Sequence, residues 1–152
     1  MAFNFQQCRD YCLMQLQSVE DFPFGPDAYV YKVAGKIFAI LGEEQGIARV
    51  NLKCDPTEAL MLRDIFAAIS PGYHMNKQHW NTVLLDGSVP DNEIKRQIDN
   101  SYRLIVNSLP KAKRGDSLMA ALAGFDKDFI SELEKNSHTA NLPIFGTDDA
   151  TD

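Results

Sequence analysis

The chain has 152 residues, of which 45% are hydrophobic and 24% charged, as in an ordinary soluble globular domain. Its longest apolar stretches, such as Ile37–Leu41, are far too short to cross a bilayer, which argues against a membrane span. Three cysteines without a CxxC pair, and no basic-then-apolar N-terminal run, lead us to expect a cytoplasmic protein.

The net charge of −6 is unevenly distributed along the chain. Residues 1–116 hold 13 basic and 14 acidic side chains, whereas residues 117–152 hold 2 basic and 7 acidic ones. Nucleic-acid binding depends on clustered Lys and Arg side chains, so an acidic protein is unfavourable for it. Because most of the acidity belongs to the C-terminal part, a local basic face on the main body remains open.

The first third of the chain predicts a helix followed by three strands. Apolar residues at helical spacing over residues 4–18, with Asn4 as the N-cap, favour the helix. Prolines and glycines in residues 19–28 break it. Three strand-like runs follow, joined by short connections that contain glycine and favour an antiparallel meander: residues 29–33, 37–41 and 47–53.

The middle of the chain predicts two more helices and two more extended segments. Asp55 and Pro56 favour the start of a helix that runs to about residue 67. Residues 73–75 and 80–85 look extended. A third helix is predicted over residues 91–109, because its apolar residues repeat every three or four positions. This order predicts an α+β fold, a two-layer sandwich in which an antiparallel sheet of about five strands carries helices on one face.

The C-terminal part differs in character, so we divide the chain into a domain over residues 1–116, a helical extension over 117–136 and an acidic tail over 137–152. The tail lacks apolar periodicity and is expected to be mobile. The extension carries one apolar face, which must pack on the domain, on a protein partner or on a second copy. That face consists of Leu118, Leu122, Phe125, Phe129 and Leu133.

The segment "PGYHMNKQHWNTV", residues 71–83, is the most unusual part of the sequence, but it lacks the pattern of a metal or catalytic site. His74 and His79 would point to opposite faces of a strand, and the segment contains no Cys, Asp or Glu. The chain also lacks a GxSxG elbow and a Gly-rich phosphate loop. We therefore predict no metal, no cofactor and no enzymatic activity; an enzyme would instead require a pocket in which His74 or Cys54 has a strongly perturbed pKa.

A polar and aromatic contact surface is the remaining functional interpretation of this segment. Its donors suit phosphate oxygens or base edges, and its aromatic rings suit stacking on an unpaired base. Tyr73 and Trp80 are the candidates for stacking, although a tryptophan at the start of an apolar strand, as Trp80 is, is more often a core residue. The lysines also fit a solvated sheet edge. The candidate nucleic-acid contacts are Asn76, Lys77, His79, Arg49, Lys53, Lys32 and Lys36.

Two stretches resemble a known family. "SPGYHMNKQHWNTV" with the following "LLDGSVPDNEIKRQIDNSYRLIVNSLPKAKR", and the earlier "FPFGPD", closely resemble the MmcQ/YjbR family over roughly residues 4–114. The resemblance implies a fold similar to the CyaY/frataxin-like one and DNA binding through a double-wing motif, with no catalytic residues. Iron binding along an acidic first helix is not expected, because helix 4–18 carries only Asp10 as an acid.

The leading hypothesis from the sequence is therefore a non-enzymatic binding protein with DNA as its partner, contacted through projecting loops or hairpins. The alternative is a protein-interaction or small-ligand-binding module with no nucleic-acid role.

Overall fold

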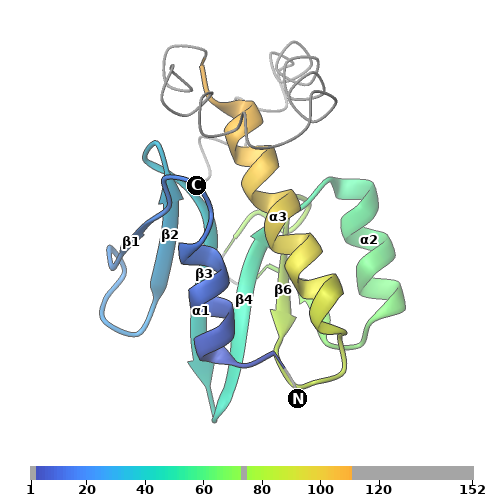
Figure 1. Cartoon of the computed structure of the whole chain (residues 1–152). Helices are drawn as coiled ribbons and strands as arrows, with labels where there is room; N and C mark the ends of the chain where they lie inside the picture. The colour runs from blue at the N-terminus through green and yellow to red at the C-terminus, as the bar shows by residue number, and fades with distance from the viewer. Residues whose placement is uncertain (1–2, 73–74, 111–152) are drawn as a thin grey trace.

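A computed structural model describes residues 3–72 and 75–110 of the chain. The elements within these residues are, in chain order, α1 (Phe5–Leu13), β1 (Val19–Asp21), β2 (Tyr29–Val33), β3 (Lys36–Glu44), β4 (Ile47–Lys53), α2 (Pro56–Ile65), β5 (Ile69–Pro71), β6 (Trp80–Leu84) and α3 (Asp91–Ser108). This is an α+β fold, which confirms the predicted class (Figure 1).

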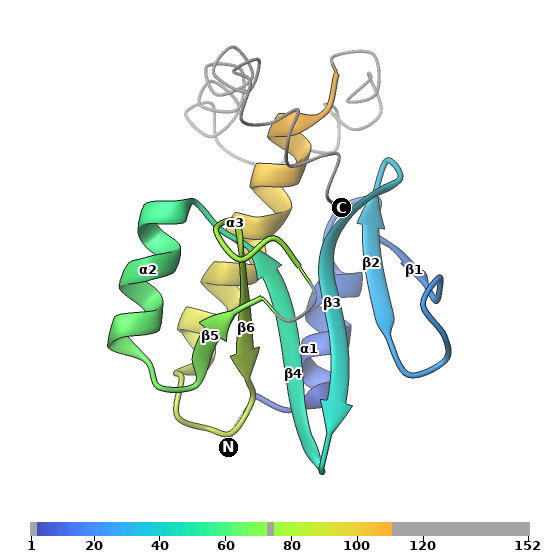
Figure 2. The same ribbon diagram turned by 180° about the vertical axis from the view of Figure 1, so that it is seen from behind.

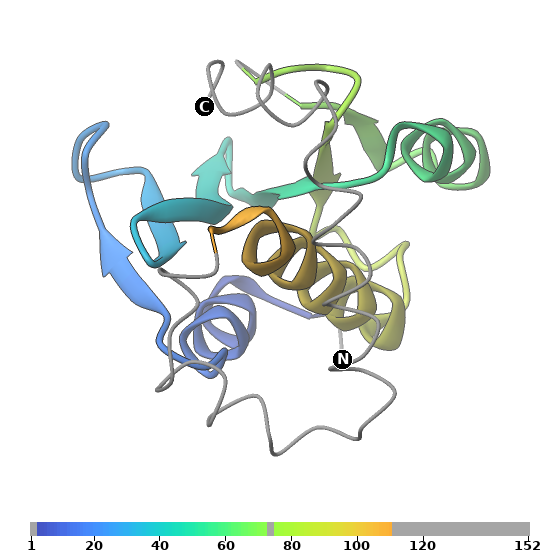
Figure 3. The ribbon, with the colours of Figure 1, turned by 90° about the horizontal axis from the view of Figure 1, so that it is seen from above.

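The strands form one antiparallel sheet in the order β1-β2-β3-β4-β6-β5. Helices α1 and α3 cover one face of this sheet, and α2 lies beside α3 towards the β6 and β5 end (Figures 1 and 3). The opposite face, seen in Figure 2, carries none of these three helices. We call it the helix-free face; the β1–β2 loop and the connection between β5 and β6 lie at it.

Local hydrogen bonds at the predicted positions explain where two of the helices begin. The Asn4 side chain accepts from the Gln7 backbone N at 2.8 Å, and the Gln7 side chain accepts from the Asn4 backbone N at 3.0 Å, which is a capping box. Asp55 caps α2 in a similar way by accepting from the backbone N of Thr57 at 3.1 Å, with Pro56 at the first helical position.

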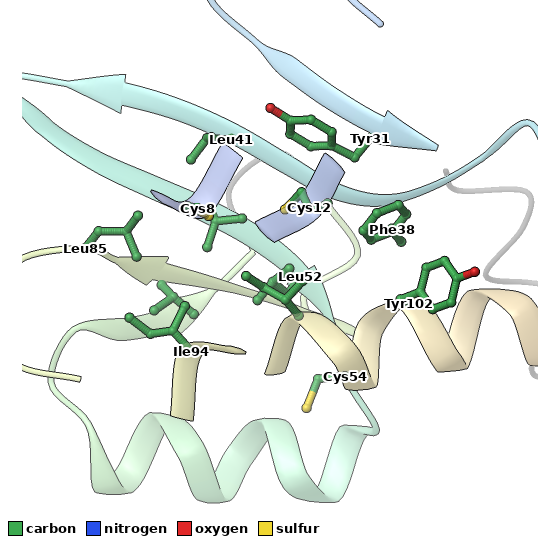
Figure 4. Packing of buried hydrophobic residues seen from close by; sticks show 14 of the residues in the cluster. Cys8, Cys12, Tyr31, Phe38, Leu41, Leu52, Cys54, Leu85, Ile94 and Tyr102 are labelled. Carbon is green, nitrogen blue, oxygen red and sulfur yellow. The ribbon is translucent and has the colours of Figure 1, made fainter. Parts of the chain in front are cut away.

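The hydrophobic core lies between the sheet and the helices α1 and α3 (Figure 4). Phe38 from β3 and Tyr102 from α3 pack edge to face, with ring centroids 5.3 Å apart. Tyr102 also donates its hydroxyl to the Leu16 carbonyl oxygen at 2.7 Å, because a buried phenol needs a polar partner. The apolar stripe predicted for residues 91–109 is thus the face of α3 that packs against the sheet.

A β-bulge shapes the middle of the sheet. The β2–β3 register shifts at Tyr31 and Lys32, so that Tyr31 pairs with Ala39 and Lys32 pairs with Ile37. The β3–β4 register ends nearby at Ala39 and Leu52. Beyond that pair the hydroxyl of Ser101 bridges the two strands from α3: it donates to the Phe38 carbonyl at 2.6 Å and accepts from the Lys53 backbone N at 2.9 Å.

Several boundaries differ from the sequence predictions. The first helix ends at Leu13 rather than 18, and the sheet has six strands rather than about five within the described residues. The added strand β1 lies in the segment assigned to a break, where a short edge strand with an exposed–intermediate–exposed pattern leaves no apolar alternation to detect. Residues 73 and 74 of the extended segment predicted at 73–75 lie outside the described residues, and the strand described before them is β5, Ile69–Pro71.

The predicted helical extension, the acidic tail and the apolar face from Leu118 to Leu133 lie outside the described residues. Among the residues that the structure does describe, no helix is long and apolar enough to cross a membrane.

Candidate functional site

The described part of the molecule has a pocket of about 670 Å³ on the helix-free face. Its volume lies within the range of small-molecule sites, roughly 300 to 1,000 Å³. We call it the open-face pocket, and the residues that line it are Phe24, Gly25, Pro26, Asp27, Ala28, Ile37, Ile40, Leu41, Gly42, Glu43, Arg49, Asn51 and Met75.

Strand alternation places the floor of the pocket. Leu41 and Leu52 point into the core, so Ile40 and Asn51, which are partners across β3 and β4, point to the helix-free face. Arg49 lies on the same side, two residues before Asn51. Phe24 lines the wall formed by the β1–β2 loop and is 64% exposed, which is unusual for a phenylalanine.

The β1–β2 loop lies close to the floor at Gly42. A Cβ atom at this position would lie 3.6 Å from the Asp27 carbonyl oxygen, which is ordinary van der Waals contact. Phe24 and Pro26 thus face a floor of β3 and β4, while Met75 lines the pocket from the connection between β5 and β6. The site is a cleft between two loops over an apolar sheet surface.

Two polar side chains in the lining are held in place by their neighbours. Arg49 forms an ion pair with Glu44 at 2.8 Å, and its side chain is 26% exposed against 59% for Glu44. Asn51 is 9% exposed, and its Oδ1 accepts from the Thr82 hydroxyl at 2.7 Å. Because this bond fixes the amide orientation, the Nδ2 donors of Asn51 lie on the other side of the group.

The predicted contact residues in the connection between β5 and β6 mainly stabilise the conformation of that connection. The Asn76 side chain accepts from the Gln78 backbone N at 3.0 Å, as in an Asx turn. Exposed Lys77 donates to the Gly72 carbonyl at 3.3 Å, and half-buried His79 accepts at its carbonyl from the Cys54 backbone N at 2.7 Å. Arg63 from α2 also donates to the Lys77 carbonyl.

Two of the candidate contact residues are buried in this structure. Trp80 is 0% exposed, so its ring is not available for base stacking here. Lys53 pairs with Trp80 across β4 and β6 and is 3% exposed, so it does not project from the sheet as a contact. Strand alternation places Arg49 and Lys53 on one face of β4, but packing covers Lys53 and leaves Arg49 partly exposed.

The other predicted basic residues belong to different elements of the sheet. Lys32 forms an ion pair with Asp21 at 3.0 Å on the β1–β2 side of the sheet. Lys36 is half-buried at the β2–β3 turn, beside Gly35. Arg49 lines the open-face pocket. Tyr73 and His74 lie outside the described residues.

The sequence analysis missed most of the pocket because its lining comes from the β1–β2 loop and two strands. The available signal was the motif "FPFGPD", in which Phe24 lies between Pro23 and Pro26. A phenylalanine in such a turn-forming segment is a candidate for an exposed pocket wall. Asn51 and Ile40 carried no signal, since their proximity depends on the β3–β4 register.

The described residues give no support to metal or thiol chemistry. They contain no group of three or more His, Cys, Asp or Glu side chains that could hold a metal ion. Burial, with the nearby Glu58 and Asp55 carboxylates, raises the pKa of the Cys54 thiol to about 12. Cys54 therefore stays protonated at neutral pH, which is the opposite of an activated nucleophile.

Comparisons with known proteins agree on one family. A sequence model of the YjbR family matches residues 15–104. The uncharacterized protein YbdF of Escherichia coli O157:H7 is 40% identical over 90 residues, which cover 59% of this chain and 74% of YbdF. The uncharacterized protein YjbR of Escherichia coli K12 is 43% identical over 83 residues, which cover 55% of this chain and 70% of that protein.

Two solved structures are similar to the chain. The crystal structure of Deinococcus radiodurans protein DR2400, described as a DUF419 domain, has a TM-score of 0.68 and 35% sequence identity, with coverage of 73% of this chain and 85% of that one. A crystal structure of a Pseudomonas syringae protein has a TM-score of 0.59 and 33% identity, with coverage of 66% and 97%.

Proposed function

The chain belongs to the YjbR family, and from that premise we propose that it is a non-enzymatic binding protein whose ligand is a small molecule held in the open-face pocket. The observation that carries the proposal is the pocket itself: about 670 Å³, with mainly apolar walls and the polar side chains Arg49 and Asn51 in its floor. Pockets of this size with a few fixed polar groups are the usual form of a ligand site.

The position of the charges supports this choice over nucleic acid. Phosphate contacts work through several exposed Lys and Arg side chains on one surface. Here Lys53 is buried, Lys32 is paired with Asp21, and Arg49 is paired with Glu44.

A neutral fluorescent probe tests the pocket without presuming the charge of its ligand. We expect Nile red to bind the wild-type protein saturably at one site and Ile40→Trp to weaken that binding at least about tenfold, because the larger ring fills the floor of the pocket. Fluorescence titration gives both affinities, and circular dichroism verifies that each variant is folded.

Ile65→Trp is the matched control for this experiment. Ile65 is 62% exposed at the end of α2 and does not line the pocket, so the same substitution there should leave the affinity for Nile red unchanged. Equal affinities for all three proteins, or no saturable binding by the wild type, would refute the ligand pocket.

A labelled duplex of mixed sequence tests the competing nucleic-acid hypothesis. If DNA is the partner, its anisotropy should rise in a salt-sensitive way, and Lys77→Ala should lower the salt slope by about one. The small-ligand proposal instead expects Lys77→Ala to leave Nile red binding unchanged, since the Lys77 side chain is outside the pocket lining. The two titrations thus distinguish the partners on the same pair of proteins.

A further inference from the structure

From the polar groups of the open-face pocket we infer the class of its ligand: an apolar molecule that carries a single carboxylate, with the carboxylate at Arg49 and Asn51. The inference rests on the proposed function, because it concerns the same pocket. It goes further by assigning opposite ends of the ligand to different parts of the lining.

The apolar part of the ligand is matched by the walls. Phe24 and Pro26 face the pocket from the β1–β2 loop, Ile37 and Ile40 form its floor on β3, and Met75 lies at the other loop. The exposed Phe24 ring would be covered by a bound apolar group, which removes its area from water. An apolar body of this kind explains why the Phe24 ring is left at the surface.

The carboxylate is matched by donors on the helix-free face of β4. Arg49 carries a planar guanidinium, whose five N–H groups fit a carboxylate, and Glu44 already contacts its Nη1 from one side at 2.8 Å. Asn51 follows two residues later, with its Oδ1 accepting from Thr82 and its Nδ2 donors therefore on the other side of the amide. Buried Lys53 continues the same face, so Asn51 lies between two basic residues.

Carboxylates also occur in the lining and would favour a cation instead. Asp27 and Glu43 belong to exposed positions, where water screens a charge strongly, whereas Asn51 is 9% exposed and the Arg49 side chain 26%. Water screens a charge less at a less exposed position, so Arg49 should interact with a bound head group more strongly than the exposed acids do. The floor donors are therefore expected to outweigh the rim acids in selecting the charge of the ligand.

Three probes with the same phenylpropyl skeleton test this assignment by isothermal titration calorimetry at neutral pH. They are 3-phenylpropionate, 3-phenyl-1-propanol and 3-phenylpropylamine, which differ in a negative, neutral or positive head group. We expect the carboxylate to bind about 10- to 100-fold more tightly than the alcohol, because its hydrogen bonds are charge-assisted. The amine should bind no more tightly than the alcohol.

Two variants connect the effect to the proposed residue. Arg49→Gln should bring the affinity for 3-phenylpropionate down to that of the alcohol, while Arg96→Gln on α3, outside the pocket lining, should leave it unchanged. Glu44→Gln provides an independent check that keeps the arginine: it removes the carboxylate that competes for the guanidinium and should tighten 3-phenylpropionate binding.

The outcomes separate this inference from the proposed function. Equal binding of acid and alcohol, tighter binding of the amine, or no binding of any of the three would overturn the carboxylate assignment while Nile red still binds. Unchanged acid affinity in both Arg49→Gln and Glu44→Gln would overturn it as well. If Nile red does not bind saturably either, both the proposed function and the carboxylate assignment are refuted.

Discussion

Ser101→Ala is expected to destabilise the protein by about 2 to 6 kcal/mol, because one hydroxyl serves two buried backbone groups. Ser101 is 0% exposed, donates to the Phe38 carbonyl at 2.6 Å and accepts from the Lys53 backbone N at 2.9 Å. Each buried group left without its bond costs about 1 to 3 kcal/mol. Urea unfolding followed by circular dichroism measures the change in the free energy of unfolding.

Ser108→Ala is the matched control in the same helix. The Ser108 hydroxyl donates to the Ile105 carbonyl at 2.7 Å, but the residue is only half-buried and this hydrogen bond stays within α3. We expect the cost of this change to stay below about 1 kcal/mol. Equal losses for the two variants would show that the Ser101 bridge has no special role at the bulge.

Gly72→Ala is expected to destabilise the protein by about 1 to 3 kcal/mol through overpacking. A Cβ atom at this position would lie 2.7 Å from the Trp80 Cβ and 3.0 Å from its carbonyl oxygen, closer than non-bonded carbon atoms approach in practice. The Gly72 backbone N also donates to the Trp80 carbonyl at 2.7 Å. Neither of these two segments can therefore move away from the other without losing that hydrogen bond. Thermal unfolding provides the measurement.

Gly42→Ala is the control for the missing side chain itself. Its new Cβ would meet only the Asp27 carbonyl oxygen, at 3.6 Å, and the site lies within the regular part of β3. We expect a change within about 0.5 kcal/mol, since no contact is forced. A loss at Gly42 as large as that at Gly72 would point to the backbone rather than to crowding against Trp80.

The helices show how far local pattern reaches. Asn4, and Asp55 with Pro56, predicted two helix starts that the structure confirms through hydrogen bonds within three residues along the chain. The ends were harder to predict: the first helix ends five residues earlier than residue 18, because tertiary contacts rather than local signals decide where a short helix turns into a strand.

The candidate site shows the opposite limit. Arg49 was among the predicted contacts, but its role depends on Glu44, Asn51 and the β1–β2 loop, which the register of β3 and β4 brings together. Lys53 was a candidate contact and Trp80 a candidate for either stacking or the core, and both are buried. Residue type predicts average exposure, whereas tertiary packing sets it for particular residues.

The sequence by itself determined the family, the α+β class and the order of most elements, because motifs, caps and apolar spacing act over a few neighbouring residues. Only the tertiary structure decided the edge strand β1, the bulge bridged by Ser101 and the pocket on the helix-free face. These features join residues that are up to 63 positions apart, as Phe38 and Ser101 are, and no local pattern specifies which distant groups will meet.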